Sequence, residues 1–309
     1  MSKSGFGNAP TRREFIAAAS MAPLAGLMRS IPSLAQAQQP AATAFKDVRG
    51  GVGIFTGRGG TIGWFVSKEA VAAIDSQYPD TAKTCLDGIN QRSGSHSINC
   101  LMITHHHADH TAGIGVFRPV ARRVVSYVKV PELMKQAAIQ AKNEDQQTYP
   151  DTTFTDTRVE DLGKEKAQLE HFGPGHTGGD AVILFEKANV VHMGDLVFNR
   201  RHPFIDRPSG ASIAGWIKVL ETVAKKYSKD AIFIYGHAQQ GFEVTGRTPD
   251  LLYQRDYFTA LLDYVRAEIK AGKPRAAIIQ ATETLKGFPD HGPLVQRVLE
   301  STYDELAPA

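Results

Sequence analysis

The sequence predicts a layered α/β domain, and two observations support this fold class. Short apolar runs with β-like composition alternate with longer segments of helical periodicity along most of the 309-residue chain. Hydrophobic residues make up 42% of the chain and charged residues 22%, which is ordinary for a globular protein with a substantial core. The length allows one large domain or two.

The first half of the predicted domain combines strands with one long helix. Its strands are expected at these apolar runs: Val48–Thr56, Thr61–Ser67, Val71–Asp75 and Ile98–Ile103. The glycine-rich stretch 57–60 indicates a turn between the first two. The helix runs from Tyr78 to about Arg92, because Pro79 suits a first helical turn and Ser93-Gly94 suits a stop.

The second half repeats this order after two shorter helices, predicted at about Thr111–Phe117 and Pro131–Asn143. A polar stretch, Asn143–Gly163, separates them from further strands. These strands are expected near Gln168–Phe172, Ala181–Phe185, Val190–Met193 and Ala231–Tyr235. A helix at Ser212–Lys226 precedes the last strand, and the tail from Pro249 is strongly helical.

The run Thr104–His110 concentrates potential metal ligands directly after the fourth predicted strand. His105, His107, Asp109 and His110 form the pattern His-x-His-x-Asp-His. Burying such groups without partners is costly, and imidazole nitrogens with carboxylate oxygens are what Zn²⁺ prefers when no thiolate is offered. Histidines two positions apart on an extended loop point the same way, so His105 and His107 can share one ion. Asp109 and His110 are offset toward a second ion. A solvated histidine-rich loop is the alternative, but it does not explain the carboxylate at this spacing.

Three later motifs complete a resemblance to the metallo-β-lactamase superfamily. Each follows an apolar β-like run, and they occur in this order: Gly175-His176-Thr177-Gly178-Gly179, Met193-Gly194-Asp195 and Tyr235-Gly236-His237. The resemblance covers about Val48 to His237. It implies an αββα four-layer sandwich with the metal loops at one edge, between the two sheets.

The resemblance also implies a site for two Zn²⁺ ions per chain, with iron or manganese as alternative metals. The implied ligands are His105, His107 and His176 for one ion, Asp109, His110 and His237 for the other, and Asp195 as the bridge. A hydroxide held between the ions is the expected nucleophile, and Asp109 is the candidate catalytic residue that orients it.

Two neighbouring residues have expected supporting roles. Asp75 ends a strand before the metal loop and matches a position where the family usually carries an aspartate that orients a ligand. A helix-capping aspartate is the alternative for this position. His106 is expected to point away from the metals and to pack or hydrogen-bond locally.

The predicted function is hydrolysis of an ester, thioester or lactone by metal-bound hydroxide. Asp195 argues against a true β-lactamase, since those enzymes carry Cys or Ser at this position. The motifs are closer to hydroxyacylglutathione hydrolases (glyoxalase II) and acyl homoserine lactonases. The alternatives are an iron-dependent sulfur or persulfide dioxygenase, or phosphodiesterase or β-lactamase activity on the same fold. A non-catalytic binding protein has little use for an open dimetal site.

The loop Phe198–Phe204, which follows the bridging aspartate, is expected to overhang the metals. Arg200, Arg201 and His202 are candidate ligands for an anionic group of a small-molecule substrate. The alternative is that the arginines pair with internal carboxylates such as Asp206.

The N-terminal residues 1–37 resemble a twin-arginine signal peptide, with Arg12 and Arg13 as the charged pair and cleavage after Ala37. The apolar stretch Ala17–Leu27 is too short and weak for a stable membrane span. We therefore expect the twin-arginine translocase as an export partner and a periplasmic location. Residues 38–309 would form the hydrolase domain with a helical C-terminal extension.

The net charge gives no support for nucleic-acid binding, and the two cysteines do not indicate a metal site. The net charge of +3 is too small and dispersed to argue for nucleic acid. Cys85 and Cys100 lie in no metal-ligand pattern, and the sequence leaves open whether they form a disulfide or remain free thiols.

Overall fold

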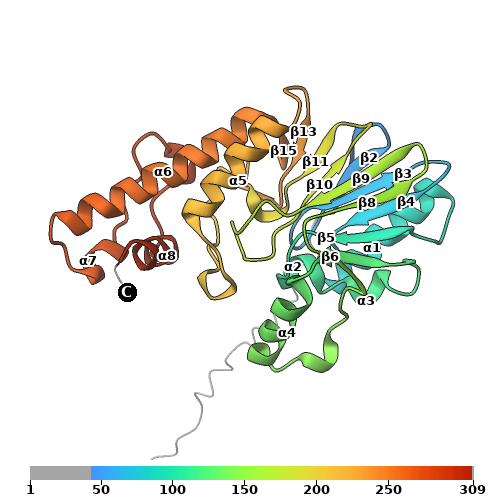
Figure 1. Cartoon of the computed structure of the whole chain (residues 1–309), viewed down its shortest axis with the longest axis horizontal. Coiled ribbons are helices and arrows are strands. Elements are labelled where there is room, and N and C mark those ends of the chain that lie inside the picture. Colours follow the sequence, from blue (N-terminus) through green and yellow to red (C-terminus); the bar gives the residue numbers. More distant parts are fainter. Residues whose placement is uncertain (1–42, 308–309) are drawn as a thin grey trace, which may run out of the picture. The chain divides into compact units, whose positions relative to one another are not determined.

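A computed structural model describes residues 43–307, which belong to one compact unit (Figure 1). Two β-sheets pack between helices, as the sequence predicts for an αββα sandwich. The expected signal peptide, residues 1–37, lies outside the described residues. Among residues 43–307, no helix has the length and apolar character needed to cross a membrane.

The first sheet has seven strands, which follow one another in sequence order across the sheet. The pairs from β1 to β4 are antiparallel and those from β4 to β7 are parallel. Its strands are β1 (Ala44–Arg49), β2 (Val52–Thr56), β3 (Ile62–Val66), β4 (Val71–Ile74), β5 (Cys100–Ile103), β6 (Val124–Tyr127) and β7 (Thr152–Phe154).

The second sheet has six strands in the order β15-β13-β11-β10-β9-β8. They are β8 (Thr157–Leu162), β9 (Glu165–Glu170), β10 (Val182–Phe185), β11 (Val190–His192), β13 (Ile232–Ile234) and β15 (Thr245–Gly246). Two short strands, β12 (Phe198–Asn199) and β14 (His237–Ala238), form a separate parallel pair beside it.

Helices cover the outer face of each sheet. The α-helices are α1 (Pro79–Ser93), α2 (Ala108–Thr111), α3 (Ile114–Phe117), α4 (Val130–Ala141), α5 (Ile213–Lys226), α6 (Thr248–Lys270), α7 (Arg275–Ile279) and α8 (Gln296–Leu306). Short 3₁₀ turns occur at η2 (Glu144–Gln146), η3 (Gly194–Leu196), η4 (Arg207–Ser209) and η5 (Pro289–His291). In Figure 1, α1 and α3 lie beside the first sheet, while α5 and α6 lie beside the second.

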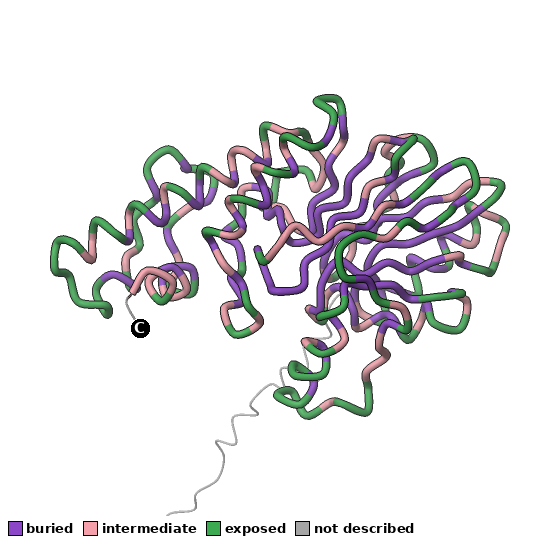
Figure 2. Tube along the Cα trace, in the orientation of Figure 1, coloured by how far each residue is buried: buried purple, intermediate pink, exposed green. Residues whose placement is uncertain are grey.

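Buried apolar side chains form two clusters, and the strands are the most continuously buried part of the trace (Figure 2). The first cluster fills the space between the sheets, where the rings of Phe65 and Phe185 stack with centroids 5.6 Å apart. The second joins the second sheet to α5, α6 and α8, and there Trp216 packs on Phe258 at 4.6 Å. Each large side chain buried in this way contributes about 1.5–3 kcal/mol.

The differences between predicted and observed elements occur at chain reversals, at sheet edges and at β6, a buried interior strand where the sequence analysis predicted none. The predicted strand Val48–Thr56 is divided by a turn at Gly50 and Gly51, whose φ angles are +61° and +87°. The predicted helix Thr111–Phe117 is replaced by α2 and α3, which are interrupted at Ala112–Gly113. The polar stretch Asn143–Gly163 contains β7 and β8.

Both cysteines are buried and free, which resolves the alternatives left by the sequence. Burial raises the pKa of the Cys85 and Cys100 thiols far above their ordinary value. They therefore pack as small apolar side chains.

Candidate metal centre

The seven predicted ligands come from five segments that meet at one edge of the sandwich. The first four lie on the loop after β5 and in α2, and His107 itself precedes α2 in extended conformation. His176 lies between β9 and β10, Asp195 in η3 after β11, and His237 at the start of β14. Strand ends therefore bring together residues that are more than 130 positions apart.

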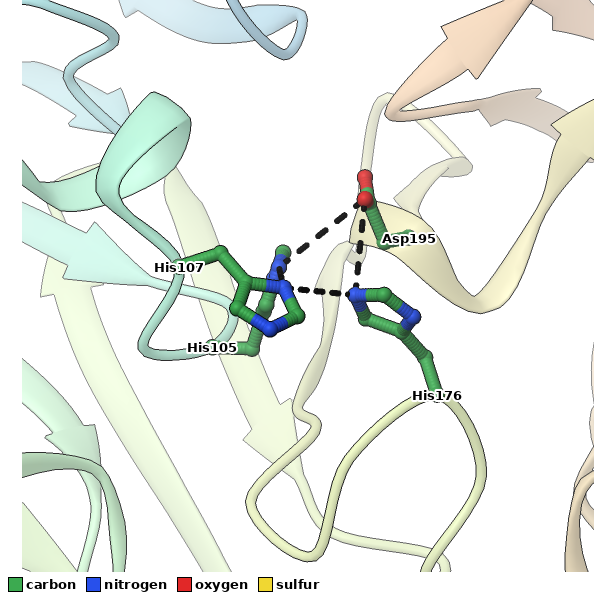
Figure 3. A group of neighbouring side chains, drawn as sticks. All are labelled: His105, His107, His176 and Asp195. Atoms are coloured by element: carbon green, nitrogen blue, oxygen red, sulfur yellow. Dashed lines mark hydrogen bonds and ion pairs between the residues drawn. The ribbon is translucent and has the colours of Figure 1, made fainter. Parts of the chain in front are cut away.

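The first group consists of His105, His107, His176 and Asp195, whose donor atoms all lie within 4.8 Å of one another (Figure 3). The Nδ1 atom of His107 is 3.1 Å from His105 Nε2 and 2.8 Å from His176 Nε2. The Oδ2 atom of Asp195 lies 3.5 Å from His176 Nε2. Three imidazole nitrogens and one carboxylate oxygen thus converge on one point.

The second group consists of Asp109, His110 and His237. The Nε2 atom of His237 is 3.1 Å from Asp109 Oδ2 and 3.3 Å from Asp195 Oδ2. The other Asp195 oxygen, Oδ1, is 3.0 Å from His110 Nε2. The carboxylate of Asp195 therefore contacts both groups, as a bridging residue must.

The electrostatics of the two groups fit bound cations. Burial lowers the pKa of His105 well below its ordinary value and that of His176 to about 3, so both present neutral nitrogens. Burial alone would lower the pKa of His237, but the negative charge of Asp195 outweighs it and raises this pKa to about 9. The carboxylates of the second group thus favour positive charge, which a divalent metal ion supplies.

Buried polar atoms without hydrogen-bond partners give a further test of whether this site suits a metal ion. His110 Nε2 and Asp195 Oδ1 are both buried, and neither has a well-aligned hydrogen-bond partner among residues 43–307. Each is the other's nearest charged neighbour, at 3.0 Å. Such atoms cost free energy unless a ligand binds them, and the donor set suits Zn²⁺.

Asp75 contacts the loop Thr104–His110, which carries four of the predicted ligands. Its side chain is fully buried and accepts hydrogen bonds from Thr104 N and Thr104 Oγ1, each at 2.8 Å. Its Oδ2 atom also lies 2.8 Å from His110 Nδ1. Thr104 Oγ1 is 3.0 Å from His105 Nδ1. Asp75 therefore orients His110 directly and His105 through Thr104, leaving each Nε2 free for metal.

Other ring nitrogens are oriented by the loop that follows β12. Asp206 Oδ2 lies 2.9 Å from His107 Nε2, and the Phe204 carbonyl lies 2.7 Å from His176 Nδ1. The sequence analysis missed both partners, because Asp206 and Phe204 follow no recognisable motif and are distant in sequence from the histidines that they contact.

Another buried aspartate, Asp180, shapes the loop that carries His176. It accepts hydrogen bonds from Thr177 N, Thr177 Oγ1 and Gly175 N. Burial raises its pKa to about 7. The Asp at the end of the Gly175–Asp180 segment was a signal for this role that the sequence analysis did not use.

At two positions beside the site, the backbone lies so close to a predicted ligand that only glycine fits. A Cβ atom on Gly236 would lie 1.9 Å from Asp195 Oδ1, and one on Gly60 would lie 2.1 Å from the His110 ring. Any side chain at these positions would displace a predicted ligand.

His106 belongs to neither ligand group. Its Nε2 atom lies 3.3 Å from Ser209 Oγ and 3.5 Å from Asp206 Oδ2, and burial lowers its pKa to about 4. His106, His107 and Asp206 do form a third set of potential metal donors. We interpret their contacts as hydrogen bonds, since Asp206 is already engaged by His107 Nε2.

A pocket of about 310 Å³ opens over the site. Its lining residues are Tyr78, His107, Ala108, Asp109, Asp195, Phe198, Arg201, Phe204, His237 and Arg297. A larger cavity of about 600 Å³ lies among hairpin turns and contains none of the predicted site residues. We assign the chemistry to the smaller pocket, because ligand groups and cavity coincide there.

Of the three candidate substrate-binding residues, only Arg201 lines this pocket. The guanidinium of Arg200 instead lies over the Tyr253 ring and 3.5 Å from Asp250 Oδ1. His202 is buried, with its ring nitrogens 2.8 Å from Tyr257 Oη and from the Pro293 carbonyl. Arg200 and His202 therefore contact partners inside the protein and do not line the pocket. For Arg200 the carboxylate partner is Asp250, not the Asp206 considered from the sequence.

Comparisons with known proteins agree with this architecture. The family model described as the metallo-β-lactamase superfamily matches residues 91–237. A curated relative, metallo-β-lactamase IND-1 of Chryseobacterium indologenes, is 24% identical over 181 residues, which cover 56% of this chain and 70% of the relative.

Solved structures show the same fold. A metallo-β-lactamase from Pontibacter korlensis superposes with a TM-score of 0.59 at 17% identity, covering 71% of this chain and 99% of that one. A double mutant of the sec-alkyl sulfatase PisA1 gives a TM-score of 0.65 at 14% identity, covering 85% of this chain and half of the sulfatase. Together with the converging His and Asp side chains, the match of the family model over residues 91–237 supports membership of the metallo-β-lactamase superfamily.

Proposed function

We propose that this protein is a dizinc hydrolase that cleaves a small ester, thioester or lactone. The match to the superfamily model over residues 91–237 and the cluster of His and Asp donors both indicate a metal-dependent hydrolase. The single observation that carries the finer proposal is the carboxylate of Asp195, which contacts both ligand groups directly below the pocket.

Bound at these two groups, zinc ions would polarise a substrate carbonyl and lower the pKa of a water molecule toward neutrality. The chain's own residues would then position the reactants. Burial tends to raise the pKa of Asp109, but His110 and His237 outweigh it and lower this pKa to about 2. Asp109 is therefore ionised at neutral pH and can accept a hydrogen bond from the attacking water, which fixes the water's orientation.

The pocket wall supports an acyl substrate of modest size. Phe198 stacks on the His237 ring with centroids 5.3 Å apart, and Phe204 lies 5.4 Å from the His107 ring. These rings offer apolar contact beside the metal ligands and exclude water from the reacting carbonyl. The cavity lies at the lower end of the usual range for small-molecule sites, roughly 300–1,000 Å³.

The curated relative and one solved structure are named as metallo-β-lactamases. We nevertheless propose an ester, thioester or lactone substrate, because Asp195 stands where the β-lactamases of the family carry Cys or Ser. Asp195 would add a second carboxylate, besides that of Asp109, to the residues that would hold the metals, and so would change the charge presented to the substrate.

Substrate preference provides a direct test. We expect the zinc-loaded protein to hydrolyse 4-nitrophenyl acetate, a simple thioester or a lactone with kcat/KM at least about 100-fold above that for the β-lactam nitrocefin. Treatment with a chelator followed by re-addition of zinc should remove and restore this activity. Efficient nitrocefin turnover with no ester, thioester or lactone hydrolysis would overturn the substrate assignment but not the fold.

We further propose that the twin-arginine translocase exports the protein to the periplasm, as residues 1–37 suggest. Changing Arg12 and Arg13 together to lysine should leave the full-length precursor in the cytoplasm, whereas the wild type should be recovered from the periplasm as a shorter chain. Normal periplasmic recovery of the double variant, measured by cell fractionation and mass spectrometry, would refute this proposal.

A further inference from the structure

Two arginines from distant parts of the chain line the pocket over the candidate metal centre. Arg201 follows β12, whereas Arg297 lies in α8 of the C-terminal extension. Both arginines are exposed, and neither forms an ion pair with a carboxylate among residues 43–307. Two positive charges therefore lie at the pocket wall without a negative partner within the described chain.

The local backbone separates Arg201 from its neighbour Arg200. Arg200 adopts a left-handed conformation with φ +58°. Its guanidinium is held over the Tyr253 ring, 3.6 Å from the centroid, and lies near Asp250 and Asp290. The turn is thereby anchored to α6 and to η5, and the following residue, Arg201, is the one that lines the pocket.

The helix α8 fixes the second arginine and the loop beside it. Arg297 Nη2 donates a hydrogen bond to the His202 carbonyl at 3.2 Å. One turn later, Ser301 Oγ donates to the Ile205 carbonyl at 3.3 Å. At the end of the helix, Glu305 pairs with Arg207 at 2.9 Å. Three successive contacts thus hold α8 against the loop, so that Arg297 has a defined position at the pocket.

We propose that Arg201 and Arg297 bind a carboxylate of the substrate, at the end remote from the acyl carbon that is cleaved. Planar guanidinium groups match carboxylate geometry and retain their charge at all relevant pH values. The two apolar rings, Phe198 and Phe204, lie in the same wall and suit the short chain between the two ends. The inference rests on the proposed hydrolytic function and names its substrate class as small acyl compounds that carry a free carboxylate.

A matched pair of esters tests this inference. The mono-4-nitrophenyl ester of adipic acid carries the carboxylate, and 4-nitrophenyl hexanoate is its neutral counterpart of equal acyl length. After correction for hydrolysis without enzyme, we expect the wild type to prefer the acidic ester in kcat/KM. Arg201→Ala and Arg297→Ala should each reduce this preference roughly fivefold, mainly through KM, and increasing salt should reduce it as well.

Control variants separate substrate binding from support of the loop. Ser301→Ala removes a contact between the same helix and the same loop without removing a cation, so the preference should stay unchanged. Arg297→Lys keeps the charge and should retain part of the preference. If Arg297→Ala and Ser301→Ala reduce both esters equally, Arg297 acts only through the loop and the inference is wrong.

Binding without turnover provides a second readout. Adipate and hexanoate share one carboxylate and a six-carbon chain, and only adipate has a second carboxylate for the arginines. Calorimetry should show tighter binding of adipate to the wild type and a smaller difference in Arg201→Ala and Arg297→Ala. Equal affinities for the two compounds would overturn the inference. Absence of hydrolysis of both esters, with the adipate preference intact, would instead count against the proposed hydrolytic function.

Discussion

Replacing Asp195 by alanine should remove one of the two metal ions and reduce kcat/KM for the best ester substrate by at least about 100-fold. The physical reason is that both oxygens of this carboxylate are engaged. Oδ1 lies beside His110, and Oδ2 lies beside both His176 and His237. Without Asp195 each group keeps three donors. The first keeps three buried or half-buried histidine nitrogens, whereas the second keeps two histidine nitrogens and the half-buried carboxylate of Asp109.

Metal content by mass spectrometry, together with calorimetric titration of the metal-free variant, measures this effect. We expect the first ion to remain and the second to bind weakly. Asp195→Asn serves as the matched variant, since it keeps the shape and one acceptor oxygen but loses the charge, and it should fall between wild type and alanine. If Asp195→Ala retains wild-type metal content and rate, the bridging assignment fails.

The substitution Asp75→Asn should have the second large effect, on both the stability of the fold and the affinity for metal. The residue has φ +62°, which asparagine tolerates, so the substitution preserves the backbone and isolates the carboxylate. The amide oxygen can still accept from Thr104 N, but its NH₂ group cannot accept from Thr104 Oγ1 or His110 Nδ1. Leaving two buried donors without acceptors should lower the free energy of unfolding by about 2–4 kcal/mol.

The same substitution should weaken metal binding about 10- to 100-fold, because the imidazole of His110 loses its orienting partner. Denaturant unfolding and metal titration measure the two effects. Ser76→Ala is a useful control, since it removes only the hydrogen bond from Ser76 Oγ to the His110 carbonyl at 2.9 Å. An Asp75→Asn protein with unchanged stability and metal affinity would show that Asp75 has no positioning role.

The residues of the candidate metal centre could be picked out from the sequence because each lies in a short motif at the end of an apolar strand. His105, His107, Asp109 and His110 are neighbours in the chain, so local spacing alone groups them. The residues that orient them are harder to find. Asp206 contacts His107 across 99 positions, and nothing in its own neighbourhood marks that contact.

The arginines illustrate the same limit for the substrate pocket. Arg200 and Arg201 are adjacent and chemically identical in sequence, but a left-handed turn and the distant acids Asp250 and Asp290 give them different environments. Arg297 reaches the pocket only because α8 packs back on the loop after β12. Such placement depends on long-range packing, which periodicity does not reveal.

Four of the strands that were missed or merged share a physical cause, because β1, β7, β8 and β15 lie at the sheet edges. The missed strand β6 does not share it, since β6 is a fully buried strand inside the first sheet. An edge strand is partly exposed, so it carries fewer apolar residues, and its sequence pattern is often typical of a polar loop. In β8, for example, only Glu160 and Leu162 are buried. The central strands, β4, β5, β10 and β11, are apolar runs and were predicted within a few residues.

The metal content of freshly purified wild-type protein tests the central claim most directly. The account predicts about two zinc ions per chain, because two groups of donors share the carboxylate of Asp195. Elemental analysis by mass spectrometry on protein purified without added metal or chelator gives this number. One iron ion per chain and no zinc would contradict the account and would favour dioxygenase chemistry at the same site.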